Sequence, residues 1–100
     1  MIWFGPAGSS HSFKAMGYKA AHQSPEYLKK FDLNAYEYQC GRGVRVNPDD
    51  AAKLKASSRE QGIRLSLHSP YYISLSSVEE EKRLGSIRYI LESAAAARLM

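Results

Sequence analysis

Four side chains that could bind a metal ion, a phosphate or a nucleic-acid base lie at or just after the ends of two predicted strands. His68 ends the apolar run "IRLSLH", and Tyr71 and Tyr72 come directly after it in "SPYY". Arg42 lies between two glycines at the end of a second, aromatic stretch. A neutral imidazole ligates zinc or accepts a proton, a guanidinium binds phosphate, and exposed tyrosines stack on bases or wedge into a duplex. Together these residue types indicate a phosphate-bearing substrate, provided that the fold brings them to one place.

Each of these residues also has a plainer interpretation. An isolated histidine at a strand end is often structural, buried tyrosines are core residues, and arginines are commonly solvated. The remaining histidines, His11 and His22, and the single cysteine show no ligand spacing such as HxxxH or CxxC, so no complete metal site is visible. Cys40 has no neighbour in the sequence that would lower its pKa, which favours a small buried residue over a nucleophile. Either His68 binds no metal, or its co-ligands lie outside these residues.

The elements that position these residues are three strands alternating with helices. Residues 1–4, "MIWF", predict an apolar strand buried on both faces, and residues 33–40 and 63–67 predict two more. Strands at roughly thirty-residue spacing, each followed by a helix, form βαβ units with parallel strands. The carboxyl ends of parallel strands share one rim, so residues 39–42 and His68 are expected to lie on it.

Terminus signals predict three helices. The first runs from Ser24-Pro25-Glu26 to about Phe31, the second spans residues 48–61, and the third begins near residue 77. Residues 5–23 show no helical or strand period and predict a long loop that lines a site. The expected capping residues are Asn47 before the second helix, Gly62 after it, Ser76 and Ser77 with Glu79 and Glu80 as a doubled capping box, and Asp32 where glycine normally ends a helix.

Composition indicates a single ordinary globular domain. The 100 residues are 44% hydrophobic and 24% charged. The 14 basic and 10 acidic residues give a net charge of +4, which fits an acidic partner such as a nucleic acid and equally a solvated basic surface with no special partner. One cysteine excludes an internal disulfide and favours a reducing compartment. No leader and no stretch long enough to span a membrane is visible, so we expect a cytoplasmic protein.

The expected fold class is α/β, and its architecture depends on the length of the chain. Helices on one side of three strands would leave the other face of an apolar sheet in water, whereas a complete (β/α)₈ barrel takes about 250 residues. A doubly wound sheet is the competing architecture, but the first strand has no GxGxxG turn and no P-loop occurs. The pattern favours the first three βα units of an incomplete TIM barrel, with residues 1–100 as the N-terminal part of one domain.

Two stretches resemble a known family. "AYEYQCGRGV" and "HSPYYISLSS" are the most specific parts of a resemblance, extending over nearly the whole chain, to the N-terminal part of endonuclease IV-type apurinic/apyrimidinic endonucleases of the xylose isomerase-like TIM barrel superfamily. The resemblance implies a zinc cluster on the carboxyl rim that hydrolyses the phosphodiester 5′ to an abasic site in double-stranded DNA. His68 matches the first zinc-ligand histidine of the family. Tyr71 and Tyr72 match the segment that enters the minor groove, and Arg42 matches the arginine-bearing loop after the second strand.

The same resemblance implies that the remaining zinc ligands lie on later strands. The chain alone is therefore expected to bind DNA weakly and to cleave nothing, and it contains no catalytic residue of its own. Two alternatives stay open. One is a sugar isomerase or epimerase of the same superfamily, with residues 5–23 closing over a small polyol. The other is a non-catalytic protein that pairs its open sheet edge with a second copy.

Overall fold

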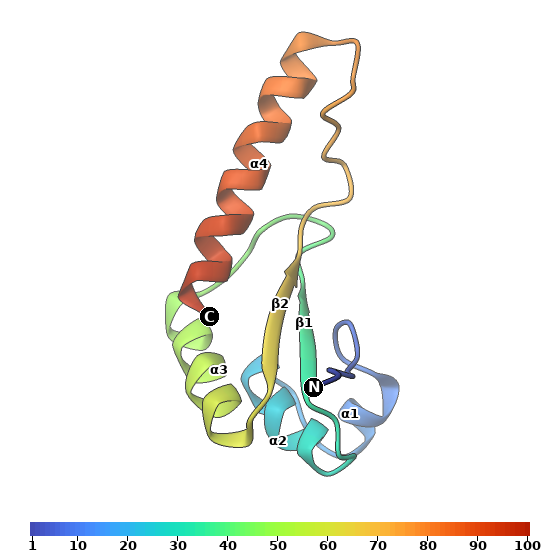
Figure 1. Cartoon of the computed structure of the whole chain (residues 1–100), viewed down its shortest axis with the longest axis vertical. Helices are drawn as coiled ribbons and strands as arrows, with labels where there is room; N and C mark the ends of the chain where they lie inside the picture. Colours follow the sequence, from blue (N-terminus) through green and yellow to red (C-terminus); the bar gives the residue numbers. More distant parts are fainter.

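The computed structural model describes all residues, 1–100, as a mixed α/β chain around an open, two-stranded parallel sheet. In Figure 1, three helices surround the sheet, and the last helix projects away from it beside a long connecting loop. The molecule is elongated, with extents of 46 × 30 × 24 Å. The elements, in chain order, are α1 (His11–Ala15), the 3₁₀ turn η1 (Ala21–Gln23), α2 (Ser24–Lys29), β1 (Ala35–Gln39), α3 (Pro48–Gln61), β2 (Arg64–His68) and α4 (Glu80–Leu99).

The strands β1 and β2 pair in parallel, as the sequence predicts. Tyr36 lies opposite Leu65, and Gln39 lies opposite His68. Because side chains alternate along a strand, one face of the sheet carries the aromatic and leucine side chains that join the core. The other face carries Glu37, Gln39, Arg64, Ser66 and His68. The expectation of an apolar second face is therefore wrong: the open face is polar and tolerates water.

The N-terminal residues do not form the predicted buried strand. Residues 1–4 belong to no regular strand. Their side chains are exposed because no second layer of the fold covers them. The segment that follows does run beside β1: the carbonyl of Phe4 accepts hydrogen bonds from the N–H groups of Asn34 and Ala35, and that of Pro6 accepts one from Glu37. An isolated bridge joins Ala7 to Glu37 in the parallel direction. The direction of this first segment is thus as predicted, and its burial is not.

Gly5 lies at the closest approach of this segment to β1. A Cβ atom at this position would lie 1.6 Å from the carbonyl oxygen of Ala35, far inside any real contact distance. Only a residue without a side chain fits there.

Residues 5–23 contain two short helical segments, so the prediction of an unstructured loop is wrong. The Ser10 hydroxyl caps α1 by accepting from the N–H of Phe13, whose ring is buried. A helix of five residues is too short to show a period in the sequence. The segment contributes Phe13 to the core cluster, whose five buried members are Phe13, Tyr27, Leu28, Tyr36 and Ile63.

The predicted helix from Ser24 is confirmed, although its cap differs. Ser24 lies inside α2, and the preceding Gln23 occupies the cap position without a side-chain hydrogen bond. Pro25 stands in the first turn as predicted. Asp32 adopts a left-handed backbone with φ of 56°, which is the position that a helix-closing glycine normally takes.

The termini of α3 are confirmed at both ends. The Asn47 carboxamide oxygen accepts from the N–H groups of Asp49, at 2.8 Å, and Asp50. Gly62 closes the helix in the left-handed conformation, with φ of 69°. Both signals are local, and so sequence alone identifies them.

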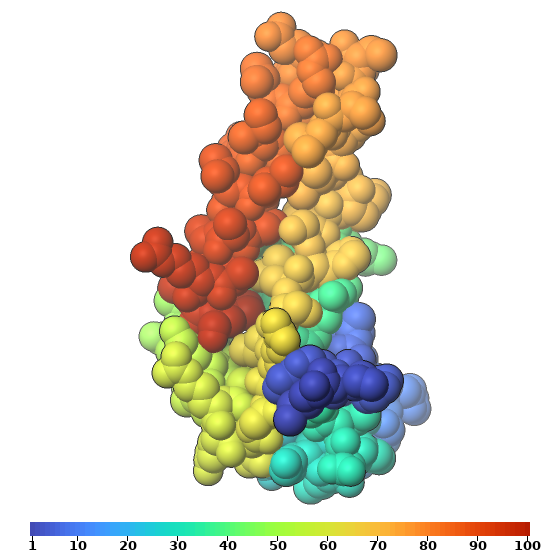
Figure 2. Space-filling model, in the orientation of Figure 1, coloured from blue at the N-terminus to red at the C-terminus, as the bar shows by residue number.

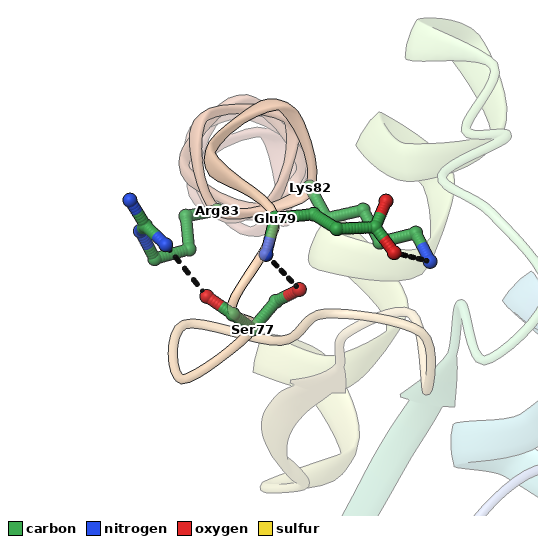
Figure 3. A network of polar contacts seen from close by, with 4 residues as sticks. All are labelled: Ser77, Glu79, Lys82 and Arg83. Atoms are coloured by element: carbon green, nitrogen blue, oxygen red, sulfur yellow. Dashed lines mark hydrogen bonds and ion pairs between the residues drawn. The ribbon is translucent and has the colours of Figure 1, made fainter.

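The helix α4 begins at Glu80, a little later than predicted, and the doubled capping box does not form. Ser77 instead accepts from the N–H of Glu79 at 3.2 Å, and its carbonyl accepts from Nη1 of Arg83 at 2.7 Å (Figure 3). Lys82 pairs with the Glu79 carboxylate at 3.0 Å. The serine hydroxyl thus stabilises the turn that enters the helix, while an arginine one turn along the helix holds that turn in place.

Few residues of this chain are buried. Only 15 of 100 fall in that class, because the open face of the sheet and most of α4 have no covering layer. In Figure 2 the loop before α4 and the helix form a separate projecting part, and the dark blue N-terminal segment lies on the outer surface of the sheet region. None of the helices combines the length and apolar character needed to cross a membrane.

Candidate functional site

The carboxyl ends of β1 and β2 meet at one edge of the sheet, as βαβ geometry predicts. The N–H of Cys40 donates to the carbonyl of His68 at 2.9 Å, and the N–H of Tyr71 donates to the carbonyl of Gly41 at 3.0 Å. These two bonds hold the loop that carries Arg42 against the segment that follows β2. The predicted histidine, arginine and tyrosines therefore share one rim, but only Arg42 and Tyr71 line a common hollow there.

An open hollow of about 680 Å³ lies in this rim, and we call it the rim hollow. Arg42 and Arg45 bring two positive charges to it, and Tyr71 brings an aromatic ring. Guanidinium groups bind phosphate oxygens through paired hydrogen bonds, and an aromatic face stacks on a base. The complete lining is Gln39, Gly41, Arg42, Gly43, Arg45 and Tyr71. This combination suits an anionic ligand too large to be enclosed.

The two tyrosines differ in their surroundings. Tyr72 packs edge-on against two rings, at centroid distances of 5.5 Å to Tyr71 and 4.9 Å to Tyr89 of α4. Tyr71 is 78% exposed, whereas Tyr72 is 42% exposed. The loop is also tied to α4 by the N–H of Ser74, which donates to the Ser86 hydroxyl at 2.8 Å. Tyr71 is thus the ring available to a ligand, and Tyr72 supports it from behind.

His68 faces a carboxylate that the sequence reasoning missed. Its Nδ1 atom lies 3.3 Å from Oε1 of Glu37, and the side chains are 52% and 36% exposed. The same carboxylate oxygen accepts a hydrogen bond from Nε2 of Gln39 at 3.0 Å. Strand alternation was the available signal, since Glu37, Gln39 and His68 share the face that points away from the helices.

The residues of this chain fit one ligand position of a zinc site and not a whole site. Metal-binding histidines characteristically donate a hydrogen bond to a carboxylate or carbonyl from the nitrogen that does not bind the metal. Nδ1 of His68 lies within ion-pair distance of Glu37, but the two side chains form no hydrogen bond. A catalytic zinc takes about three protein ligands. No group of three or more His, Cys, Asp and Glu side chains converges anywhere in the chain.

Comparisons with known proteins give one relative. The chain is 37% identical over 98 residues to "Uncharacterized protein MJ0133" of Methanocaldococcus jannaschii, an alignment that covers 94% of this chain and 32% of that protein. No family model matches the chain, and no solved structure matches it significantly. The chain thus spans about a third of the length of this relative, whose name carries no activity.

The other candidates noted in the sequence lie outside the rim hollow. Cys40 is buried, as predicted, and burial raises the pKa of its thiol, which reduces the thiolate fraction that a nucleophile requires. His11 is exposed at the start of α1. His22 is half-buried in η1, and its Nδ1 atom has no hydrogen-bond partner. Neither histidine approaches His68 as a co-ligand.

Proposed function

We propose that this chain forms part of the carboxyl rim of a zinc-dependent endonuclease of the endonuclease IV type, which hydrolyses the phosphodiester 5′ to abasic sites in double-stranded DNA. One observation carries the proposal: Arg42 and the exposed Tyr71 line a common hollow at the strand ends, with His68 beside it on β2. This juxtaposition supports the proposal, because a guanidinium can bind a phosphate, an aromatic ring can stack on a base and an imidazole can ligate zinc.

The fold proposal that accompanies this function is the first three βα units of a TIM barrel. The segment 4–8, β1 and β2 lie side by side in chain order, and the bonds between neighbours run in the parallel direction. Gln39 and His68 lie at the carboxyl ends of the strands, which is the end of a barrel where active sites form. The strand edge of β2 has no partner in this chain, which leaves a place for a further strand.

In this proposal the residues of the rim hollow hold the DNA. Arg42 binds a backbone phosphate, Tyr71 stacks on or wedges beside the bases at the lesion, and Tyr72 keeps Tyr71 in place through the ring contact. His68 would hold zinc, which supplies an activated water and neutralises charge on the phosphate when it is bound. Because this chain fits a single ligand position, the chain alone is expected to bind an abasic duplex without cleaving it. The proposed compartment is the reducing cytoplasm.

The sugar isomerase alternative is less well supported by the site. A small polyol is normally held in a pocket that covers most of its surface. The rim hollow is open, its aromatic residue is largely exposed, and residues 5–23 contribute no side chain to it. These features favour a larger ligand. The self-association alternative keeps one supporting feature, the unpaired edge of β2, and a compact monomer in sedimentation would contradict it.

The aromatic contact is tested with the change Tyr71→Ala. We expect the affinity of the chain for a fluorescently labelled abasic duplex, measured by anisotropy, to fall by about 5- to 150-fold, since stacking on one base contributes about 1–3 kcal/mol. The matched control is Tyr71→Phe, which keeps the ring and should keep most of the affinity. An unchanged affinity in Tyr71→Ala would contradict the proposed role, and cleavage of the duplex by the chain alone would contradict the incomplete ligand set.

The phosphate contact is tested with the change Arg42→Ala. Each cation that neutralises a phosphate adds about 0.9 to the slope of log affinity against log salt concentration. We therefore expect the slope for Arg42→Ala to be shallower by roughly that amount, whatever the DNA sequence. Arg59→Ala is the matched control, because Arg59 lies on α3 outside the rim hollow and should leave the slope unchanged. If the unaltered chain, Arg42→Ala and Arg59→Ala gave equal slopes, Arg42 would not contact the DNA backbone.

A further inference from the structure

The rim hollow is lined by two guanidinium groups, and only that of Arg42 has a role in the proposed function. Arg42 and Arg45 are both exposed and both line the hollow. Neither forms an ion pair, a side-chain hydrogen bond or a cation–π contact within the chain. By contrast, Arg64 lies over an aromatic ring, Arg83 donates to a carbonyl and Arg88 pairs with a carboxylate. The two guanidinium groups of the hollow therefore keep their donors for a ligand.

The turn that carries both arginines, residues 40–45, is anchored to the fold. The N–H of Gly43 donates to the carbonyl of Cys40 at 3.0 Å. Gly43 has a φ of 127°, and a Cβ added there would lie 3.5 Å from the hydroxyl of Tyr72. Burial raises the pKa of the Cys40 thiol, and the backbone N–H of Arg45 acts against this shift, so the Arg45 backbone lies beside a buried sulfur. The fold thus sets where each arginine leaves the backbone.

No acidic side chain lines the hollow to balance the two positive charges. The Glu37 carboxylate lies outside the lining, where it accepts a hydrogen bond from Nε2 of Gln39. Two like charges at one open hollow repel each other, and an anion bound there relieves this repulsion. The charge of Arg42 and Arg45 together therefore suits a ligand with two negative charges better than a ligand with one.

The spacing of the two arginines suits two neighbouring phosphates. Arg42 and Arg45 are separated by three residue steps, which span at most about 10 Å of chain. Successive phosphates of one DNA strand advance by about 3.4 Å along the helix axis. Each guanidinium presents a planar fork of donors that matches the oxygens of one phosphate. The hollow, at about 680 Å³, is open and has room for more than a single phosphate group.

We propose that Arg45 is a second phosphate-binding residue, so that the rim hollow holds two successive phosphates of one DNA strand, one on Arg42 and one on Arg45. This arrangement fixes the direction of the strand across the rim, because two points define a line whereas one phosphate contact leaves the strand free to rotate about it. The inference rests on the proposed function in naming DNA as the ligand. It needs no lesion, because the phosphates are the same in an intact strand.

The test is the slope of log affinity against log salt concentration for a fluorescently labelled abasic duplex. We expect the slope to be shallower by about 0.9 in Arg45→Ala and by about 1.8 in the double variant with Arg42→Ala, since each lost phosphate contact removes about 0.9. Arg45→Lys keeps the charge and should keep the slope. Arg59→Ala is again the control outside the hollow. Circular dichroism verifies that each variant is folded.

Two results would overturn the proposal. One is a slope for Arg45→Ala equal to that of the unaltered chain, which would mean that Arg45 contacts no phosphate. The other is a double variant with a slope no shallower than that of either single variant, which would mean that Arg42 and Arg45 share one phosphate.

An intact duplex of the same sequence separates this inference from the proposed function. The proposed function requires tighter binding of the abasic duplex, whereas the arginine pair requires only a DNA backbone. Equal affinities for the two duplexes, with a shallower slope in Arg45→Ala, would support the second phosphate contact and contradict the proposed function. A preference for the abasic duplex with a slope that does not depend on Arg45 would do the reverse. Failure to bind either duplex at low salt would overturn both.

Discussion

Replacing Phe13 with alanine is expected to lower the free energy of unfolding by about 3–5 kcal/mol. Phe13 is 2% exposed, stacks on Tyr18 at a centroid distance of 5.2 Å and meets Tyr27 edge-on at 5.2 Å. The truncation removes a whole ring from a core cluster of five residues, and the neighbouring rings cannot collapse into the space because a hydroxyl network holds Tyr27 to Ser10 and Ser12. Urea denaturation followed by circular dichroism measures the loss.

The matched control for this change is Phe31→Ala. Phe31 also contacts Tyr27, at 4.9 Å between ring centroids, but its side chain is 49% exposed. A half-exposed ring has lost less contact with water on folding, so its removal should cost clearly less. Equal losses for the two variants would show that residues 10–15 do not belong to the core.

Opposite effects are expected for two glycine-to-alanine changes. In Gly5→Ala the new methyl group would overlap the Ala35 carbonyl, so the segment 4–8 must leave β1, with loss of the bonds to Phe4, Pro6 and Gly8 and a cost of about 1–3 kcal/mol. In Gly85→Ala the methyl group meets nothing within 4 Å, and the helix gains about 1 kcal/mol in propensity.

The measurements for this pair are urea denaturation and amide hydrogen exchange. In Gly5→Ala the N–H of Glu37, which donates to Pro6, should lose its protection, whereas amides of α3 should keep theirs up to the global limit. Each variant serves as the control for the other, because both add the same methyl group. A stabilised Gly5→Ala would contradict the close approach of the two backbones.

Local signals predicted the fold wherever a single residue determined the backbone. Asn47 and Gly62 define α3 because a carboxamide oxygen and a left-handed glycine act on their immediate neighbours. The pairing direction of β1 and β2 followed from the helix between them. The serines before α4 were misread because Ser77 bonds to the N–H two residues on, an Asx-like turn that competes with a capping box.

Predictions that depended on distant partners were less accurate. Residues 1–4 are all apolar, which predicts burial. Burial requires a second layer of structure over them, and the local sequence carries no information about such a layer. In this structure the four side chains are exposed. The rim residues His68, Tyr71 and Arg42 were brought together correctly because parallel strands must end at one edge. Glu37 was missed because a charged residue in an aromatic strand is usually interpreted as solvent-facing. Strand alternation places it on the same face as His68, and the register with β2 brings its carboxylate near the imidazole.

The weak attachment of α4 also determines where this chain opens first. Its buried residues are two serines and an alanine, all small. The loop before it is tied to the helix only by single contacts of Ser86, Arg83 and Tyr89. Small side chains remove little apolar surface from water, so the opening free energy of the first turns lies near the bottom of the range within a folded protein. A protease would therefore make its earliest cut between residues 73 and 80. The contact between Tyr72 and Tyr89 would then last only while α4 and its loop stay closed, and not until the whole chain unfolds.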